Sequence, residues 1–272
     1  MPGVPASVAY LRKRRGKLPF FPTLLPTLRT IRIHVDQPLS PDGEVSLPPQ
    51  AGEHVARVLR LDEGDPLVLF NGDGHDYAAT IVHAGKREVR VRIGDVQVVA
   101  NESPLRLTLA QGVARGEKMD LIVQKATELG VARIVPLLTE RSEVRLDPAR
   151  AEKRLAHWRA VAASACEQSG RAHLPTVLPT QSLEAWLGGL SQDGALRLAL
   201  LPEGNRSLRS LALGAAGGLL VVGPEGGLGQ RDVGMLRSAG FDGLALGPRI
   251  LRTETAGLAA LAALQAVHGD MG

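Results

Sequence analysis

Three segments of the sequence place glycine, proline and charged residues directly after a short apolar stretch. They are Leu200-Leu-Pro-Glu-Gly204, Val222-Gly-Pro-Glu-Gly-Gly-Leu228 and Leu246-Gly-Pro-Arg-Ile-Leu-Arg-Thr-Glu-Thr-Ala256. Gly223, Gly226 and Gly227 allow positive φ and a close approach of backbone to a ligand, while Pro224 stiffens the turn. Open α/β sheets bind ligands just beyond the carboxyl ends of their strands. Any one loop alone is explained by ordinary turn chemistry, but three at one end of a sheet predict a ligand site rich in backbone groups.

Other catalytic patterns are excluded by their spacing. The sequence contains no P-loop, no GxGxxG dinucleotide fingerprint and no GxSxG nucleophile elbow. The seven histidines and the single cysteine lack the spacing of metal ligands, so we predict no metal. A nucleophilic pair of Cys166 and His173 is the weaker alternative, because His173 lies beyond the end of the expected helix.

Strands and helices alternate from residue 105 onward, which is typical of a parallel α/β domain. The expected strands are Leu105–Leu109, Ile134–Leu138, Ala195–Leu200, Leu219–Val222 and Leu244–Leu246. Helices are expected over Glu117–Leu129, from Asp147-Pro148 onward, and over Glu254–His268. The last of these is apolar on almost every side, so it must be buried in the core or between subunits.

The preceding part of the chain is rich in strands instead. Strands are expected at Ile31–Val35, Pro66–Phe70, Tyr77–Val82 and Val89–Val96, with one helix at about Gln50–Leu59. Asn71–Gly74 and Gly85–Glu88 have the composition of hairpin turns, and this pattern favours a small β-barrel. Asn101–Pro104 is a plausible hinge, so we expect a barrel over residues 30–100 and an α/β domain over 101–272.

The charge of the chain is concentrated at its start. The net charge is +4, but six Lys and Arg residues and no acid lie within residues 1–29, so the rest carries −2. We expect a disordered basic extension there, and any nucleic-acid site must be a local patch. One cysteine excludes an intramolecular disulfide, and no apolar run reaches the length of a membrane span, which favours a cytoplasmic protein.

Several motifs together resemble the ribosomal RNA small subunit methyltransferase E (RsmE) family of the SPOUT superfamily. They are Gly223-Pro-Glu-Gly-Gly227, Leu246-Gly-x-Arg-Ile-Leu-Arg-x-Glu-Thr-Ala256, Lys118–Gly130, Glu140-Arg-Ser142, Glu167-Gln-Ser-x-Arg171, His54-Val-x-x-Val-Leu-Arg60 and Gly64-Asp65. The resemblance covers about residues 31–268, and its C-terminal motif is highly specific.

The resemblance implies a PUA-like barrel followed by a knotted SPOUT domain that forms a homodimer. It also implies S-adenosylmethionine as cofactor and methylation of N3 of a uridine in 16S rRNA, in the decoding region of the 30S subunit. The implied cofactor-binding residues are Leu200, Leu201, Val222, Gly223, Glu225, Gly226, Gly227, Leu246, Gly247, Ile250, Leu251, Thr253 and Ala256.

Loss of the uridine N3 proton leaves negative charge on the neighbouring carbonyl oxygens, which a fixed arginine would stabilise. Our hypothesis assigns this role to Arg252 or Arg249, with Glu254 orienting the arginine or accepting the proton. The alternative is that Arg252 and Glu254 form a charge pair at the start of a helix.

For RNA binding, the candidates are polar or cationic residues distributed over both domains. They are Arg57, Arg60, Lys118, Lys125, Arg141, Gln168 and Arg171. Arg57 and Arg60 are expected to share one helix face, a spacing that suits phosphates. For any single residue in this group, a solvated charged surface is the simpler explanation.

Two other functions stay open. One is an RNA-binding protein without catalysis, which the intact glycine-rich loops argue against. The other is a SPOUT enzyme with a different target, such as a ribose 2′-hydroxyl of tRNA.

Overall fold

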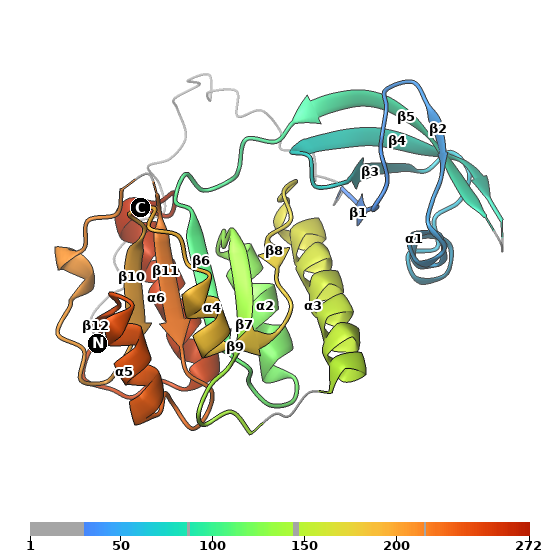
Figure 1. Ribbon diagram of the computed structural model, residues 1–272. Helices are drawn as coiled ribbons and strands as arrows, with labels where there is room; N and C mark the ends of the chain where they lie inside the picture. The colour runs from blue at the N-terminus through green and yellow to red at the C-terminus, as the bar shows by residue number, and fades with distance from the viewer. Residues whose placement is uncertain (1–29, 86–87, 144–146, 215) are drawn as a thin grey trace, which may run out of the picture. The chain divides into compact units, whose positions relative to one another are not determined.

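The computed structural model describes residues 30–85, 88–143, 147–214 and 216–272 (Figure 1). The basic extension predicted over residues 1–29 and the middle of the turn predicted at Gly85–Glu88 lie outside the described residues. Residues Ile31–Gly272 form one compact unit, which contains two β-sheets.

The first sheet contains five strands, in the order β1-β3-β4-β5-β2. They are β1 (Arg32–His34), β2 (Glu44–Ser46), β3 (Pro66–Phe70), β4 (His75–Ala84) and β5 (Val89–Val98). β1 and β3 are parallel and the other pairs are antiparallel, and the β4–β5 ladder has two register shifts, which bend it. In β5 the alternation is as predicted: Val89, Val91 and Ile93 are buried, and Arg90 and Arg92 are exposed.

The helix of this part differs from the prediction. Helix α1 (Pro49–Glu53) continues into a π-helical turn, η1 (His54–Val58). Arg60 lies beyond this turn with φ of 56°, in the left-handed region. The expectation that Arg57 and Arg60 share a helix face is therefore wrong, because the helix ends before Arg60 and the backbone changes direction.

The second sheet has seven strands, all joined by parallel pairing, in the order β12-β10-β11-β6-β7-β8, with β9 also pairing with β7. The strands are β6 (Leu107–Gly112), β7 (Arg133–Leu138), β8 (Thr176–Val177), β9 (Gln181–Ser182), β10 (Leu196–Leu200), β11 (Gly218–Val222) and β12 (Asp242–Leu244). The predicted parallel α/β domain is confirmed. The strand predicted at Leu244–Leu246 instead ends at Leu244.

Helices cover both faces of this sheet (Figure 1). They are α2 (Lys118–Glu128), α3 (Pro148–Ser169), α4 (Leu183–Gly188), α5 (Gln230–Ser238) and α6 (Thr253–His268), with a short 3₁₀ turn, η2 (Leu208–Ser210). α2, α3 and α6 pack on one face and α4 and α5 on the other. Successive residues of one strand therefore enter different cores: Leu109 of β6 faces α2 and α6, and Ala110 faces α4 and α5.

The predicted helix starts and ends are visible in the backbone. The Asp147 side chain caps α3 by accepting a hydrogen bond from the Arg150 amide at 3.0 Å. α3 ends at Gly170, which has φ of 83°, and Gly130, just after α2, has φ of 77°. α5 was not predicted, since it is short and mostly polar.

Candidate functional site

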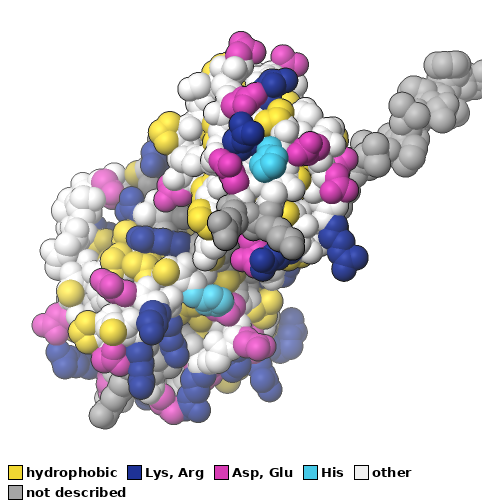
Figure 2. Space-filling view, turned by 90° about the vertical axis from the view of Figure 1, so that its right-hand side faces the viewer, with side chains coloured by type: hydrophobic (Ala, Val, Ile, Leu, Met, Phe, Trp, Pro, Cys, Tyr) yellow, Lys and Arg dark blue, Asp and Glu magenta, His cyan; other side chains and the backbone are white. Residues whose placement is uncertain are grey.

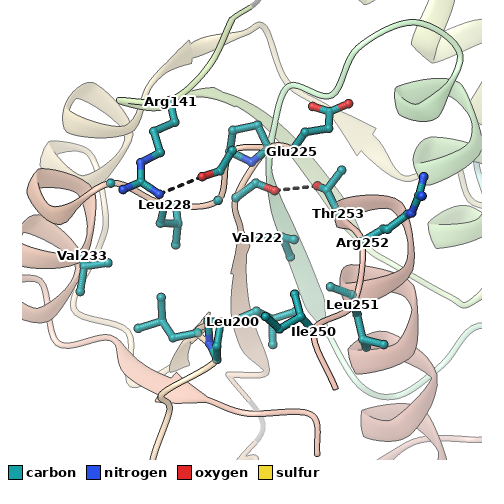
Figure 3. Close-up of a pocket in the computed structure, with 18 of the residues that line it drawn as sticks. Arg141, Leu200, Val222, Glu225, Leu228, Val233, Ile250, Leu251, Arg252 and Thr253 are labelled. Carbon is teal, nitrogen blue, oxygen red and sulfur yellow. Dashed lines mark hydrogen bonds between the residues drawn. The ribbon is translucent and has the colours of Figure 1, made fainter. Parts of the chain in front are cut away.

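A cavity of about 1110 Å³ opens where β10 and β11 end, and α5 and the start of α6 border it (Figure 3). This is the carboxyl edge of the parallel sheet, where the sequence predicts a ligand site. Its volume is slightly above the range of about 300–1,000 Å³ that is usual for small-molecule sites. Leu200, Val222, Leu228, Val233 and Ile250 give it apolar walls.

All of the predicted cofactor-binding residues line this cavity except Leu246 and Gly247. Those two line a smaller adjoining cavity of about 160 Å³, which shares Leu200, Leu201 and Ile250 with the larger one. The three loops singled out in the sequence therefore meet at one place.

A buried hydrogen-bond network joins two of these loops. The Thr253 hydroxyl donates to the Gly223 carbonyl oxygen at 2.6 Å and accepts from the Gln111 side-chain amide at 2.9 Å. The same amide donates to the Gly112 carbonyl oxygen at 2.9 Å. The first residue of α6 is therefore fixed to the loop after β11, across the end of β6.

Close packing of backbone explains the glycines of the middle loop. A Cβ on Gly223 would lie 2.7 Å from the carbonyl carbon of Gly227, and Gly227 itself has φ of 70°. A side chain at either position would force the turn open, and the loop would then lose its shape. Arg141 closes the outer side by donating to the Gly226 carbonyl oxygen at 3.0 Å.

Charged groups gather at the mouth of the cavity. The Lys118 Nζ lies 3.1 Å from Glu225 Oε1 and 3.8 Å from Glu254 Oε2. Burial alone would raise the pKa of Glu225, but hydrogen bonds from the Arg115 amide and from Lys118 outweigh it and lower the pKa. Within the described residues, the buried Glu254 Oε2 accepts no hydrogen bond, and Lys118 is its ion-pair partner.

Two acidic side chains hold the start of α5 in place. Asp232 accepts hydrogen bonds from the amides of Gly229 and Glu140, and Glu140 accepts one from the Arg231 amide. These hydrogen bonds give the backbone amides at the start of α5 acceptors that the helix itself cannot supply. They also hold α5 in the position that places Val233 in the cavity wall.

Comparisons with known proteins agree with this architecture. A family model described as an RNA methyltransferase domain matches residues 101–265, and one described as an RNA methyltransferase PUA domain matches residues 47–94. The ribosomal RNA small subunit methyltransferase E of Mycobacterium bovis is 36% identical over 78% of this chain and 82% of its own length. That of Bacillus subtilis is 33% identical over 78% of this chain and 85% of its own length. The chain belongs to the ribosomal RNA small subunit methyltransferase E family.

Similar solved structures extend the match to the fold. The enzyme of Neisseria gonorrhoeae, bound to S-adenosylmethionine, is 37% identical with a TM-score of 0.85, over 89% of this chain and 100% of that one. A putative methyltransferase of Legionella pneumophila in complex with the same cofactor is 40% identical with a TM-score of 0.86, over the same shares. The predicted fold class, a SPOUT-type α/β domain with a PUA-like domain before it, is thereby confirmed.

Of the catalytic residues expected from the RsmE motif, only two line the main cavity. Arg252 is the N-cap residue of α6, and its side chain points away from the space between Leu228 and Val233 (Figure 3). Arg249 is exposed and borders the smaller cavity. Glu254 lines the main cavity, but its cationic neighbour within the described residues is Lys118, so the proposed Arg252–Glu254 pair does not form in this structure.

Arg171 of the RsmE motif is not placed to contact RNA, contrary to expectation. It is 5% exposed, makes two hydrogen bonds to the Glu102 carboxylate, and donates to the carbonyl oxygens of Thr127 and Val131. All of these contacts lie inside the protein. Arg171 therefore holds segments of the fold together, and the prediction that it binds RNA is wrong.

The other RNA candidates have different surroundings. Lys118 and Arg141 line the main cavity, and Gln168 is exposed near the end of α3. Lys125 pairs with Glu128, and the exposed Arg57 pairs with Glu53. Figure 2 shows basic and acidic side chains interspersed on the face in view.

Sequence reasoning missed the part of the cavity wall that α5 supplies. The missed residues on α5 are Gln230, Val233, Gly234 and Arg237. The signal available was the Gly229–Asp232 spacing of a helix start, which lies directly after the glycine-rich loop.

Cys166 is not suited to nucleophilic chemistry. It is buried, and burial raises the pKa of its thiol to about 11. The ring of His173 contacts the Gly72 carbonyl oxygen instead. The described residues contain no group of three or more possible metal ligands, and none of their helices is long and apolar enough to cross a membrane.

Proposed function

We propose that this chain transfers the methyl group of S-adenosylmethionine to N3 of a uridine in 16S rRNA, in the decoding region of the 30S subunit. The observation that carries the proposal is the cavity formed by the three glycine-rich loops at the carboxyl edge of the parallel sheet. RsmE relatives with the same fold bind S-adenosylmethionine, and the family name specifies small-subunit ribosomal RNA.

The residues of the cavity fit this cofactor. Apolar side chains such as Leu200 and Ile250 can cover an adenine ring, and the backbone around Val222–Gly227 offers amide and carbonyl groups for its edge. The Glu225 carboxylate suits the positive charge of the ammonium group of methionine.

S-adenosylmethionine supplies an electrophilic methyl group on its sulfonium sulfur. The protein has three tasks: to align the uridine N3 with that methyl, to accept the N3 proton, and to stabilise the charge that develops on the uracil oxygens. We assign proton acceptance to Glu254, since its Oε2 has no hydrogen-bond partner within the described residues. Arg252, or Arg249, stabilises the developing charge after its side chain turns toward the bound uridine.

RNA binding is assigned to the cationic side chains around the cavity and on the PUA-like domain. Lys118 and Arg141 at the cavity would meet phosphates next to the target, and Arg57 and Arg60 would meet RNA farther away. The target uridine must leave its stack to reach the cavity.

We also infer a homodimer through the C-terminal domain. α6 is apolar on nearly all sides, and the side with its buried residues packs on β6, β11, α2 and η2. Leu258, Ala259 and Ala262 remain partly exposed, and Val267 is 54% exposed. A second copy that covers this face would remove apolar surface from water. Sedimentation velocity of the wild type and of Val267→Asp tests this; a monomeric wild type would contradict it.

The activity test uses 30S subunits that lack the methyl group, with radiolabelled S-adenosylmethionine, followed by nucleoside digestion and mass spectrometry. The expected product is 3-methyluridine. A 2′-O-methyl nucleoside from tRNA would instead favour the ribose-methylating alternative. Tight cofactor binding without transfer to any RNA would contradict the proposed reaction while leaving the fold intact.

A further inference from the structure

A second cavity, of about 760 Å³, lies away from the methyl-transfer site, between the first sheet and α3. Its walls come from β1, α1, the turn after β3, the C-terminal half of α3 and residues 174–177. Its polar lining includes His34, Asp36, His54, Arg159 and Glu167. None of these residues takes part in the chemistry described above.

Hydrogen bonds hold the two sides of this cavity together. The His34 amide donates to Glu167 Oε1 at 2.9 Å, and the Arg32 side chain donates to the carbonyl oxygens of Cys166 and Arg171 at 2.8 Å and 3.2 Å. β1 is therefore anchored to the end of α3, and the cavity has a defined shape.

The Glu167 carboxylate can accept further hydrogen bonds. Its one hydrogen bond within the described residues uses Oε1, so Oε2 is available to a ligand in the cavity. Burial raises the pKa of this carboxyl group, against the effects of the His34 amide, His54 and Arg32. A half-buried carboxylate facing a cavity gains most from a ligand that brings N–H donors.

His34 supplies an aromatic surface next to this carboxylate. Its ring packs against Phe70 with centroids 5.4 Å apart and lies in the cavity wall. Burial lowers the pKa of His34, despite the opposing effect of Asp36, and this favours the neutral ring. Neutral aromatic side chains beside polar groups are a common platform for unstacked RNA bases.

Arg159 supplies a fixed positive charge at the exposed side. Its Nε and Nη2 donate to the Val177 carbonyl oxygen at 3.3 Å and 3.2 Å, which holds the guanidinium in place. Within the described residues its Nη1 makes no hydrogen bond and can meet a phosphate. Asp36, also in the lining, disfavours a phosphate on its side of the cavity.

We propose that this cavity binds an unpaired guanine of the RNA substrate, with the base stacked on His34, its Watson–Crick edge donating to Glu167, and its phosphate paired with Arg159. Guanine is the base that presents two adjacent donors, N1–H and N2–H, which match the two oxygens of one carboxylate. Uracil offers one N–H between two carbonyl oxygens, which a carboxylate repels. This inference rests on the proposed function only in that the ligand is RNA.

The test measures binding without methyl transfer. Fluorescein-labelled UUGUU, UUAUU, UUCUU and UUUUU are titrated with the full-length protein at fixed salt, and fluorescence anisotropy is followed. We expect UUGUU to bind about tenfold more tightly than the other three. Glu167→Gln should abolish this preference, because an amide replaces one acceptor with a donor. Arg159→Ala should weaken all four oligonucleotides and keep the preference for guanine.

Glu152→Gln is the matched control, since Glu152 is exposed on the same helix and does not line the cavity. It should bind all four oligonucleotides as the wild type does. Calorimetric S-adenosylmethionine binding checks that each variant keeps its other site. Equal affinity for all four oligonucleotides in the wild type, or a guanine preference that survives Glu167→Gln, would overturn the proposal. Free GMP binding as tightly as UUGUU would overturn the assignment to RNA. None of these results bears on 3-methyluridine formation, which is measured separately.

Discussion

The hydroxyl of Thr253 and the carbonyl oxygen of Gly223 lie 2.6 Å apart, although the two residues are 30 positions apart in the chain. This hydrogen bond links the first residue of α6 to the loop after β11. Both segments line the proposed cofactor cavity, so the bond sets the distance between two of its walls.

Thr253→Val should therefore weaken S-adenosylmethionine binding about tenfold, because the loss of one buried hydrogen bond costs about 1 kcal/mol or more. The valine keeps the size of the threonine but cannot donate to Gly223. Titration calorimetry measures the affinity, and Thr253→Ser should restore it. Unchanged affinity in the valine variant would show that the loop keeps its position without this bond.

Glu254→Gln should lower kcat about 100-fold with little change in S-adenosylmethionine affinity, as expected on loss of a proton acceptor. Single-turnover methyl transfer to 30S subunits measures the rate. A variant with the wild-type single-turnover rate would exclude Glu254 as the base.

Arg252→Ala should reduce kcat about 100-fold if Arg252 stabilises the charge on the uracil oxygens. Arg249→Ala, assayed in parallel, decides between the two arginines, because Arg249 borders only the smaller cavity. An Arg252→Ala enzyme that binds cofactor normally and keeps full activity would transfer the role to Arg249.

Arg171→Met should destabilise the protein by about 3 kcal/mol, because it leaves the Glu102 carboxylate without its buried partner. Urea unfolding measures the change in free energy. Arg57→Ala is the comparison: its pair with Glu53 is exposed, so its stability should change little. A stable Arg171→Met variant with weakened RNA binding would reinstate Arg171 as an RNA contact.

The Glu225 carboxylate should stabilise the fold at neutral pH and lose that contribution in acid. Its pKa in the folded protein is lowered, so the stabilisation is present above its ordinary value of 4.5 and disappears as pH falls through the lower folded value. The wild type should therefore be more stable than Glu225→Gln at neutral pH. This difference in unfolding free energy, measured from neutral to acidic pH, should become smaller as the pH falls below the folded-state pKa of Glu225. A difference independent of pH would contradict this.

The position of the cavity could be predicted from the sequence because its loops have strong local signatures. Gly223 and Gly227 are required by a turn whose backbone segments nearly touch, and such requirements are visible in composition. The parallel sheet could be predicted for a similar reason, since strands covered on both faces, such as Leu219–Val222, are continuous apolar runs.

The features that sequence analysis did not predict depend on contacts between residues far apart in the chain. The residues next to Arg171 in the sequence do not indicate that its partner is Glu102, 69 positions away. A prediction from sequence therefore treats this buried arginine as a surface residue. α5 is nine residues long and contains Gly234, so its periodicity is weak and its place depends on Glu140 and Asp232. The left-handed backbone at Arg60 likewise follows from a π-helical turn that local propensity does not indicate.

The order of strands in the parallel sheet has a consequence for synthesis of the chain. β6 is made before the other six strands but lies inside the sheet, where β11 covers one of its edges and α6 covers one face. While the nascent chain emerges, β6 can pair with β7, but its other edge stays open until most of the domain has been translated. An open edge of this kind is a site for mispairing between chains. Rapid translation or crowded polysomes should therefore favour aggregation of incomplete chains, and a chaperone that shields β6 should raise the yield of folded protein.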